Sequence, residues 1–335
     1  MKTLKDSPEW HFLFFCSTVL YIFKNHKFNQ LMAHNMRFNF DKSAFGRHES
    51  FGLRYGWLTK GFNAFQEDPS VFENEDATVI LGVGKNMVKS IKNWLFSANL
   101  ISREVNGICA TDIGKLLFGK KGYDHYLENE GTIWLLHWLL ATNAESSTVF
   151  YWFFNLFHRT EFKNDDILKS LEQFVESDLK ANYSHNTLKQ DIQILLRMYS
   201  HTRESGNNEH LKELDCPLSS LQLIAYYKDA KSYQSKIEKR DHIPLGIFGY
   251  ALLDVFSAMN FKEIPLEKLI YNQDGYATIG SIFRLSENGF IYHVEKLMAA
   301  MPNVFEYSES SGLRQLYLLD EKISKYDLLK WHFDQ

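Results

Sequence analysis

Residues 75–100 constrain the fold of this chain more than any other stretch, because they predict two helices joined by a glycine turn. The sequence DATVILG at residues 76–82 indicates a short apolar helix, GVG a turn, and residues 85–101 a longer amphipathic helix. Apolar side chains of the longer helix share one face: Met87, Val88, Ile91, Trp94 and Leu95. Lys85, Lys89 and Lys92 share the opposite face. We therefore expect a helix-turn-helix with one buried side and one basic side.

The next segment predicts a small β-hairpin. Residues 100–103 and 108–111 flank a polar turn, and residues 112–118 indicate a further helix. A helix-turn-helix followed by a hairpin is the winged-helix arrangement, in which the second helix enters the major groove and the wing touches phosphates. The order of elements predicts an N-terminal winged-helix unit.

A similar order recurs near the C-terminus. Residues 265–271, 277–283 and 288–301 predict three helices, and residues 305–307 and 313–318 alternate around a polar turn as a hairpin would. Between the two units, residues 131–199 are helical in pattern and rich in aromatic residues. Core packing is the favoured explanation of these rings, with base stacking on nucleic acid as the alternative.

Composition agrees with a mostly α-helical, multi-domain protein that has a few strands. The 335 residues include only six prolines and eighteen glycines, too few for a turn-rich β-sandwich. We predict two winged helix-turn-helix units flanking an aromatic-rich helical middle. The predicted parts are a leader, an N-terminal winged-helix domain, a helical middle domain and a C-terminal winged-helix domain, at residues 1–36, 37–125, 126–240 and 241–335.

The leader contains an apolar run at residues 10–23 that is shorter than the roughly twenty residues needed to span a bilayer. A docking helix and an extension from an upstream start codon are both open, and the second is preferred because the organised pattern begins at Phe38. Cys16, Cys109 and Cys216 form no CxxC pair, so we expect neither disulfides nor a zinc finger. These features predict a cytoplasmic protein with no membrane partner.

The net charge of −4 is unevenly distributed along the chain. Residues 37–60 carry +3 and residues 82–122 carry +5, whereas residues 161–229 carry −4. A basic N-terminal region in a near-neutral protein favours an anionic partner that binds at that region, and double-stranded DNA is the leading candidate.

Two motifs identify a family resemblance. The segments FGRHESFGLRYGWLTKGF at residues 45–62 and ILGVGKNMVKSIKNWL at residues 80–95 closely resemble the SspB-type family of bacterial DNA phosphorothioation (Ssp) defence systems, long catalogued as a domain of unknown function. The resemblance covers residues 38–319. It implies a DNA-nicking protein that acts with other proteins of the phosphorothioation gene cluster in phage defence.

The glycine turn invites a nucleotide-binding interpretation, which the sequence does not support. A P-loop requires Ser or Thr after its lysine, but Asn86 follows Lys85. A helix that begins at this turn still suits a phosphate, because its first N–H groups and its dipole face the anion.

Residues 47–54 combine side chains that could act in strand nicking. A nick requires an activated nucleophile and stabilisation of the charged transition state. His48 could be a general base or a metal ligand, Glu49 a ligand for Mg²⁺ or Mn²⁺, and Arg47 and Arg54 could hold the phosphate. The alternative is structural: His48 and Glu49 fix this segment through buried hydrogen bonds, with Arg54 as an ion-pair partner.

These observations predict a DNA-binding protein that recognises target sites and nicks one strand, with His48 and Glu49 as catalytic residues and Glu49 as metal ligand. The rival hypotheses are a non-catalytic DNA-recognition adaptor and a winged-helix transcriptional regulator. Eight residues are predicted to contact DNA: Arg47, Arg54, Lys60, Lys85, Asn86, Lys89, Lys92 and Arg103.

Overall fold

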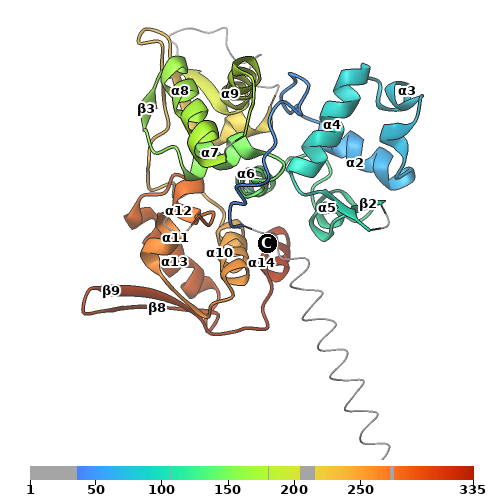
Figure 1. Cartoon of the computed structure of the whole chain (residues 1–335). Helices are drawn as coiled ribbons and strands as arrows, with labels where there is room; N and C mark the ends of the chain where they lie inside the picture. The colour runs from blue at the N-terminus through green and yellow to red at the C-terminus, as the bar shows by residue number, and fades with distance from the viewer. Residues whose placement is uncertain (1–35, 106, 180, 204–215, 272–274) are drawn as a thin grey trace, which may run out of the picture. The chain divides into compact units, whose positions relative to one another are not determined.

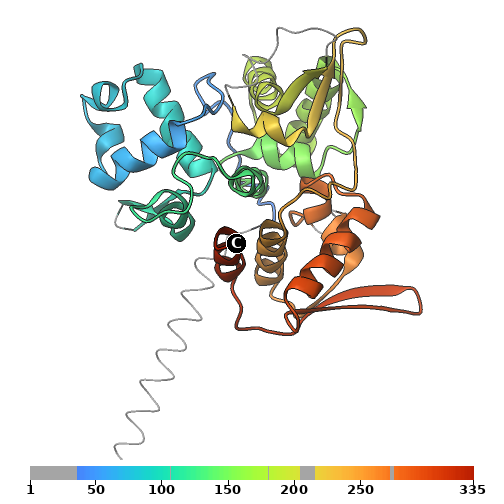
Figure 2. The ribbon, with the colours of Figure 1, turned by 180° about the vertical axis from the view of Figure 1, so that it is seen from behind.

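The structure of the chain is a computed structural model that describes residues 36–335 except 106, 180, 204–215 and 272–274. Residues 36–335 form one compact unit of mostly helical structure, in which the described strands make three small sheets (Figures 1 and 2). The predicted helical class is confirmed. Among the described helices, none has the length and apolar character needed to cross a membrane.

The N-terminal elements follow the predicted order. They are α2 (Trp57–Glu67), η1 (Val71–Glu73), α3 (Ala77–Leu81), α4 (Lys85–Ser97), the antiparallel pair β1 (Ile101–Glu104) and β2 (Gly107–Ala110), and α5 (Asp112–Phe118). Helix α2 crosses α4 closely, since a Cβ atom added at Gly61 would overlap the Ile91 side chain. The apolar face of α4 thus packs on α2, as the sequence pattern predicts.

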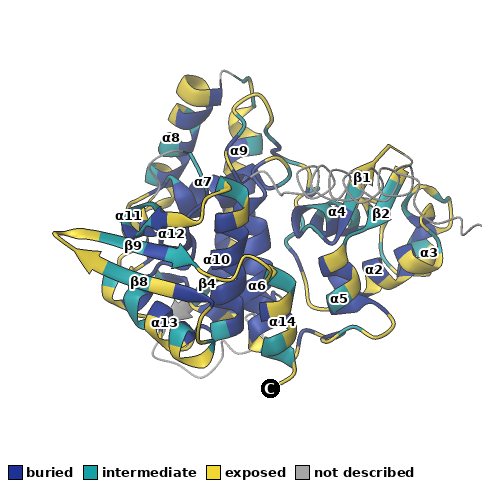
Figure 3. Ribbon diagram, turned by 90° about the horizontal axis from the view of Figure 1, so that it is seen from below, coloured by how far each residue is buried: buried dark blue, intermediate teal, exposed yellow. Residues whose placement is uncertain are grey.

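Two apolar helices lie at the centre of the unit. Helix α6 (Glu130–Thr142) is buried from Gly131 to Thr142, and α10 (Leu245–Met259) is buried from Gly246 to Phe256 (Figure 3). A helix that is apolar all round belongs in a core. The Trp138 Nε1–H group donates to Asp254 Oδ2 at 2.9 Å and joins the two helices. The aromatic residues of the middle segment are therefore core residues, and the base-stacking alternative is excluded for the fully buried ones.

Helices α7, α8 and α9 stand beside a four-stranded sheet that the sequence analysis did not predict. The helical elements are α7 (Thr148–Asn155), α8 (Asn164–Phe174), η2 (Val175–Leu179), α9 (His185–Tyr199) and η4 (Pro217–Leu221). The strands are β3 (Glu161–Phe162), β4 (Ser200–Arg203), β5 (Ile224–Tyr227) and β6 (Ser232–Gln234). Their order is β3-β6-β5-β4, and only β4 and β5 are parallel. Residues 204–215, which follow strand β4, lie outside the described residues.

Three C-terminal helices and a hairpin occur where the pattern places them, and the structure adds strand β7 and helix α14, which the sequence analysis did not predict. The C-terminal elements are β7 (Glu263–Pro265), α11 (Leu266–Ile270), α12 (Ile279–Ile282), α13 (Glu287–Ala300), β8 (Phe305–Ser310), β9 (Leu313–Leu318) and α14 (Lys325–Phe333). The long hairpin β8–β9 pairs with β7 at its base, in the order β7-β9-β8 (Figure 1). Helix α14 returns to pack on α10.

The described part of the chain begins inside the core. Met36, the last residue of the predicted leader, is buried, and its carbonyl accepts a hydrogen bond from the Ala277 N–H group at 3.0 Å. The rest of the predicted leader lies outside the described residues. One continuous hydrophobic cluster extends from Met36 to Leu329, and the domain boundaries predicted after residues 125 and 240 stay predictions.

Candidate functional site

The residues predicted to bind and cut DNA lie on a connector, defined here as residues 44–56, and on α2, α4 and β1. The connector passes between α9 and α4 (Figures 1 and 2). At one side the His48 Nε2 atom lies 3.0 Å from Asp191 Oδ1 of α9. At the other side the Phe51 carbonyl accepts a hydrogen bond from Trp94 Nε1 of α4 at 3.1 Å. The connector therefore ties the DNA-binding candidate α4 to the α7–α9 group.

His48 is buried and uses both of its ring nitrogens. The Ser50 N–H group donates to His48 Nδ1 at 3.2 Å, so the proton of the ring is on Nε2 and is donated to Asp191. The ring lies parallel to Trp94, with centroids 6.1 Å apart. Asp191 also accepts the Gly46 N–H group, at 2.9 Å. In this arrangement His48 holds a tight turn in place, as the structural alternative of the sequence analysis describes.

Glu49 does not converge with His48. The backbone of Glu49 is left-handed, with a φ of 49°, and its carboxylate Oε1 lies 3.3 Å from Lys89 Nζ on α4. The two predicted catalytic side chains therefore point to different neighbours. Their catalytic roles, and the metal-ligand role of Glu49, stay predictions.

The predicted divalent metal would need a group of side chains that can act as its ligands. Among the described residues, no three His, Cys, Asp or Glu side chains are grouped so that they could hold a metal ion. Glu49 is the sole carboxylate that the sequence analysis proposed, and a lysine already pairs with it. The described residues do not form a multi-ligand cage, and we derive no reaction step through a metal.

Helix α4 presents an exposed first turn. Lys85, Asn86 and Lys89 are exposed, whereas Lys92 is half-buried and forms an ion pair with Glu73. The helix has no acidic residue in its first turn, and no side chain caps it at Gly84. Its first N–H groups and the helix dipole therefore add to the charge of Lys85.

The other predicted DNA-binding residues surround α4. Lys60 of α2 donates to the Leu81 carbonyl at 3.2 Å, at the end of α3. Arg103 of β1 lies over the Phe96 ring of α4, with its guanidinium carbon 5.1 Å from the ring centroid. Arg54 is exposed over Trp57, and Arg47 is exposed on the connector. Lys60 and Arg103 thus lie at the two ends of α4, while Arg47 and Arg54 belong to the connector.

Cys109 on the hairpin is not an activated nucleophile. Its thiol lies 3.2 Å from the Ser102 hydroxyl across the β1–β2 pair. Burial raises the pKa of the Cys109 thiol, and a hydrogen bond with Glu104 raises it further. A thiol with a raised pKa stays protonated at neutral pH and is a weak nucleophile.

Sequence reasoning missed Asp191, the partner of His48. A signal was present, because an acidic residue stands on the apolar face of α9 that also carries Leu188, Ile192 and Leu195. A carboxylate on an otherwise apolar helix face must find donors in the core.

Comparisons with known proteins identify solved structures with a similar fold. Among solved structures, one described as an SspB crystal structure matches with a TM-score of 0.75 and 25% identity, covering 88% of this chain and 90% of that chain. A magnesium ion-bound SspB crystal structure matches with a TM-score of 0.75 and 26% identity, covering 87% and 88%. None of the curated proteins matches the sequence.

The structural comparison confirms the resemblance on which the sequence analysis relied, and the chain has an SspB-like structure over about 88% of its length. A family model described as a protein of unknown function, DUF4007, matches residues 45–333. Because this match covers far more than half of the 335 residues, the chain belongs to the DUF4007 family.

Proposed function

We propose that this chain is a DNA-recognition protein of an Ssp-type phosphorothioate modification and defence system. The observation that carries the proposal is the placement of α4, whose apolar face packs on α2 while Lys85, Asn86 and Lys89 face solvent. The antiparallel hairpin β1–β2 follows directly. In a winged-helix unit the second helix enters the major groove and the wing follows the backbone.

Each exposed group has a distinct role in this proposal. Asn86 lies in the first turn of α4, where an amide reaches base edges and suits adenine. Lys85 and the first N–H groups of α4 bind a phosphate. Arg103, on the wing, contacts the backbone on the other side of the groove.

The charge of this surface is partly compensated by the protein itself. Glu49 pairs with Lys89, and Glu73 pairs with Lys92. DNA phosphates would compete with these carboxylates, so fewer counterions are released than the number of lysines indicates. We therefore expect moderate affinity and a modest dependence on salt.

The C-terminal winged-helix candidate is less suited to DNA. In its wing, the Arg314 Nη2 atom lies 2.8 Å from Glu267 Oε1, and the same guanidinium also pairs with Glu287. The same hairpin carries Glu306 and Glu309. We assign DNA contact to the N-terminal unit, and contact with other proteins of the gene cluster to the remaining surface.

The binding test compares two double variants of equal charge change. Lys85→Ala with Lys89→Ala should weaken binding to all duplexes similarly and lower the salt slope by up to about 1.8, at about 0.9 per phosphate contact. Lys169→Ala with Lys189→Ala removes two exposed lysines from α8 and α9 and should leave both quantities unchanged. Equal affinity of the two variants would refute the assignment of α4 as the DNA-binding helix.

Strand nicking is the second candidate function, and the magnesium ion in a similar SspB structure favours it. The test incubates supercoiled plasmid with the full chain and Mg²⁺ or Mn²⁺, with EDTA as control. Metal-dependent open-circle product supports nicking by this chain. DNA binding without nicking supports the adaptor, which would deliver the modification proteins to the site.

A further inference from the structure

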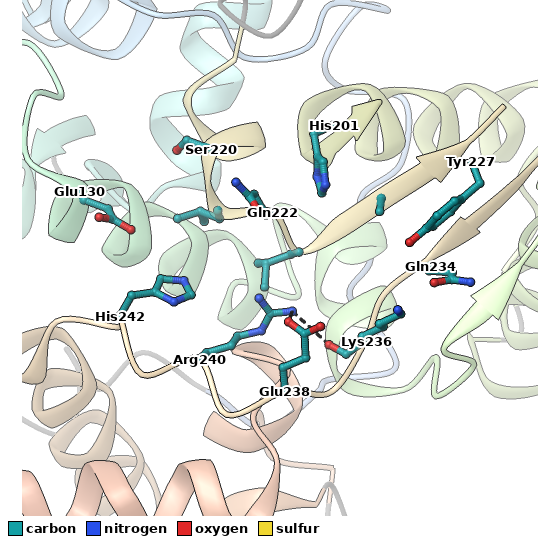
Figure 4. Close-up of a pocket in the computed structure, with 13 residues that line it drawn as sticks. Glu130, His201, Ser220, Gln222, Tyr227, Gln234, Lys236, Glu238, Arg240 and His242 are labelled. Carbon is teal, nitrogen blue, oxygen red and sulfur yellow. Dashed lines mark hydrogen bonds and ion pairs between the residues drawn. The ribbon is translucent and has the colours of Figure 1, made fainter. Parts of the chain in front are cut away.

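A cavity of about 350 Å³ lies between the four-stranded sheet and the segment that leads from β6 to α10 (Figure 4). Its walls come from the start of α6, from β4, η4, β5 and β6, and from residues 236–242. A volume of this size lies within the range of about 300–1,000 Å³ typical of small-molecule sites. No residue of α4 lines the cavity, and the cavity residues are not among the DNA contacts proposed above.

A buried arginine forms the floor of the cavity. Arg240 has 6% of its surface exposed, and its Nη2 group donates to the Lys236 carbonyl at 3.0 Å. Its Nε group donates to the Arg284 carbonyl at 3.3 Å. Carbonyl groups thus orient the guanidinium, but they do not neutralise its charge.

A second buried guanidinium lies close by and increases the imbalance of charge. Arg284 has 4% of its surface exposed and donates to the Phe153 carbonyl at 2.9 Å. Burial and, to a lesser extent, the neighbouring charge of Arg240 together lower the pKa of Arg284 to about 10. Glu238 is the carboxylate paired with Arg240, at 3.7 Å, and its side chain is 53% exposed. Three cations, Arg240, Arg284 and Lys236, thus stand against two carboxylates, Glu238 and Glu130, and this excess of positive charge favours an added anion.

Other basic side chains line the same cavity. Lys236, His201 and His242 lie around Arg240 (Figure 4). The remaining acidic lining residue, Glu130, is engaged by Trp134, whose Nε1–H group donates to it at 3.4 Å. Arg and Lys together at a concave site are typical of phosphate binding.

We propose that this cavity binds the phosphate of a single nucleotide, with Arg240 and Lys236 as the phosphate ligands. The rest of the lining suits a base and sugar, since it supplies two side-chain amides, a hydroxyl and an aromatic ring, from Gln222, Gln234, Ser220 and Tyr227. Amides recognise the hydrogen-bonding edge of a base, and a tyrosine ring offers a stacking surface. The nucleotide is either free in solution or extruded from DNA, and the same groups would recognise both.

The first test is calorimetric titration of the full chain with the four deoxynucleoside 5′-monophosphates and with the matching deoxynucleosides. The monophosphates should bind and the nucleosides should bind at least about tenfold more weakly, which corresponds to about 1.4 kcal/mol. Equal affinity for nucleosides, or no binding of any monophosphate at millimolar concentration, would overturn the proposal.

Variants locate the binding. Lys236→Glu reverses an exposed charge at the cavity and should weaken monophosphate binding at least about tenfold. The matched control, Lys231→Glu, reverses an exposed charge in the turn between β5 and β6, outside the cavity, and should bind normally. Equal weakening in both variants would overturn the assignment.

Arg240→Gln keeps a side-chain N–H donor, on a shorter side chain, and removes the buried charge. It should abolish monophosphate binding while retaining the helical circular dichroism spectrum. If the Arg240 variant does not fold, the comparison of Lys236→Glu with Lys231→Glu still tests the proposal, because Lys236 and Lys231 are both exposed. Normal binding by a folded Arg240→Gln protein would overturn the role of Arg240.

A third measurement identifies the source of the nucleotide. Duplex DNA containing 2-aminopurine increases its fluorescence when the modified base leaves the stack. A protein-dependent increase that excess monophosphate suppresses assigns the cavity to an extruded nucleotide. Monophosphate binding without such an increase assigns it to a free nucleotide, and the absence of both signals overturns the proposal.

Discussion

His48 and Asp191 stand 143 residues apart and share a buried hydrogen bond of 3.0 Å. The same carboxylate accepts the Gly46 N–H group, so one side chain of α9 holds the whole turn of the connector. The opposite side of that connector contacts α4 through Phe51. The pair therefore determines where the DNA-binding candidate helix is anchored.

This relationship predicts that His48→Ala is destabilising. The variant leaves a buried carboxylate short of a donor, at a cost of roughly 3 kcal/mol in the free energy of unfolding. Urea denaturation measures this cost. The control is His185→Ala, which breaks an exposed His–Glu pair of α9 with Glu172 and should cost less than about 1 kcal/mol. A stable His48→Ala protein that binds DNA but does not nick it would instead support the catalytic role of His48.

Glu49→Gln should strengthen DNA binding. The substitution releases Lys89 from its ion pair, and such exposed pairs contribute about 0.2–1 kcal/mol. We expect an increase in affinity of about two- to fivefold at low salt, measured by fluorescence anisotropy with a labelled duplex. Glu145→Gln, which breaks the exposed pair with Lys42, is the matched control and should have no effect. Weaker binding by Glu49→Gln would exclude Lys89 as a DNA contact.

The protein should lose stability in acid through a buried histidine. Burial, helped by the charges of Arg284 and Arg240, lowers the pKa of His137 to about 3 and outweighs the hydrogen bond to the Ile282 carbonyl, which raises it. The unfolded chain therefore takes up a proton below about pH 6.5, while the folded chain stays neutral at this site down to about pH 3. The contribution of neutral His137 to stability is fully present above pH 6.5. Below that pH the free energy of unfolding falls by up to about 1.4 kcal/mol per pH unit.

Denaturation between pH 7.5 and pH 5 measures this slope. His137→Phe should have a shallower slope, whatever its absolute stability, because the residue that titrates on unfolding is gone. Burial also lowers the pKa values of His158, His293 and His332, so part of the slope should remain in the His137 variant. An unchanged slope in His137→Phe would contradict this assignment.

Local sequence patterns predicted the helices, turns and strands that form through residues close together in the chain. The turn between α3 and α4, helix α5 and the hairpin β8–β9 each follow from a glycine, a cap or an alternation within a few residues. The four-stranded sheet was missed because its strands contain two to four residues, and because β4 and β5 pair in parallel across a long insertion. Such pairing depends on tertiary contacts that no local window contains.

The candidate site was predictable only in part, for the same reason. The exposed face of α4 follows from helical periodicity, so Lys85, Asn86 and Lys89 are exposed as expected. The position and hydrogen bonding of His48 depend on Asp191. The two residues are too far apart in the chain for a local sequence pattern to connect them. The cavity around Arg240 is assembled from five separate elements and left no motif in the sequence.

The C-terminal helix α14 is held by a buried charge pair whose loss should be costly. Lys325 Nζ lies 2.6 Å from Asp254 Oδ1 of α10. Burial alone would lower the pKa of Lys325, but the Asp254 carboxylate outweighs it and raises that pKa. In Lys325→Met the Asp254 carboxylate, which is 4% exposed, keeps its buried negative charge but loses its lysine partner. It still accepts the hydrogen bond from Trp138. We expect a loss of about 2–4 kcal/mol, somewhat less than for a fully buried pair because the Lys325 side chain is 21% exposed.

The double variant Lys325→Met with Asp254→Asn separates the charge effect from lost packing. Removing both charges should recover a substantial part of the stability, since the penalty arises mainly from the unpaired carboxylate. Lys262→Met is the control, because it breaks an exposed pair with Glu321 and should cost less than about 1 kcal/mol. Thermal and urea unfolding of the four proteins measure these differences. A double variant no more stable than Lys325→Met would show that the contacts of the Lys325 ammonium with the Tyr250 and Tyr326 rings, and not the pair with Asp254, hold α14 in place.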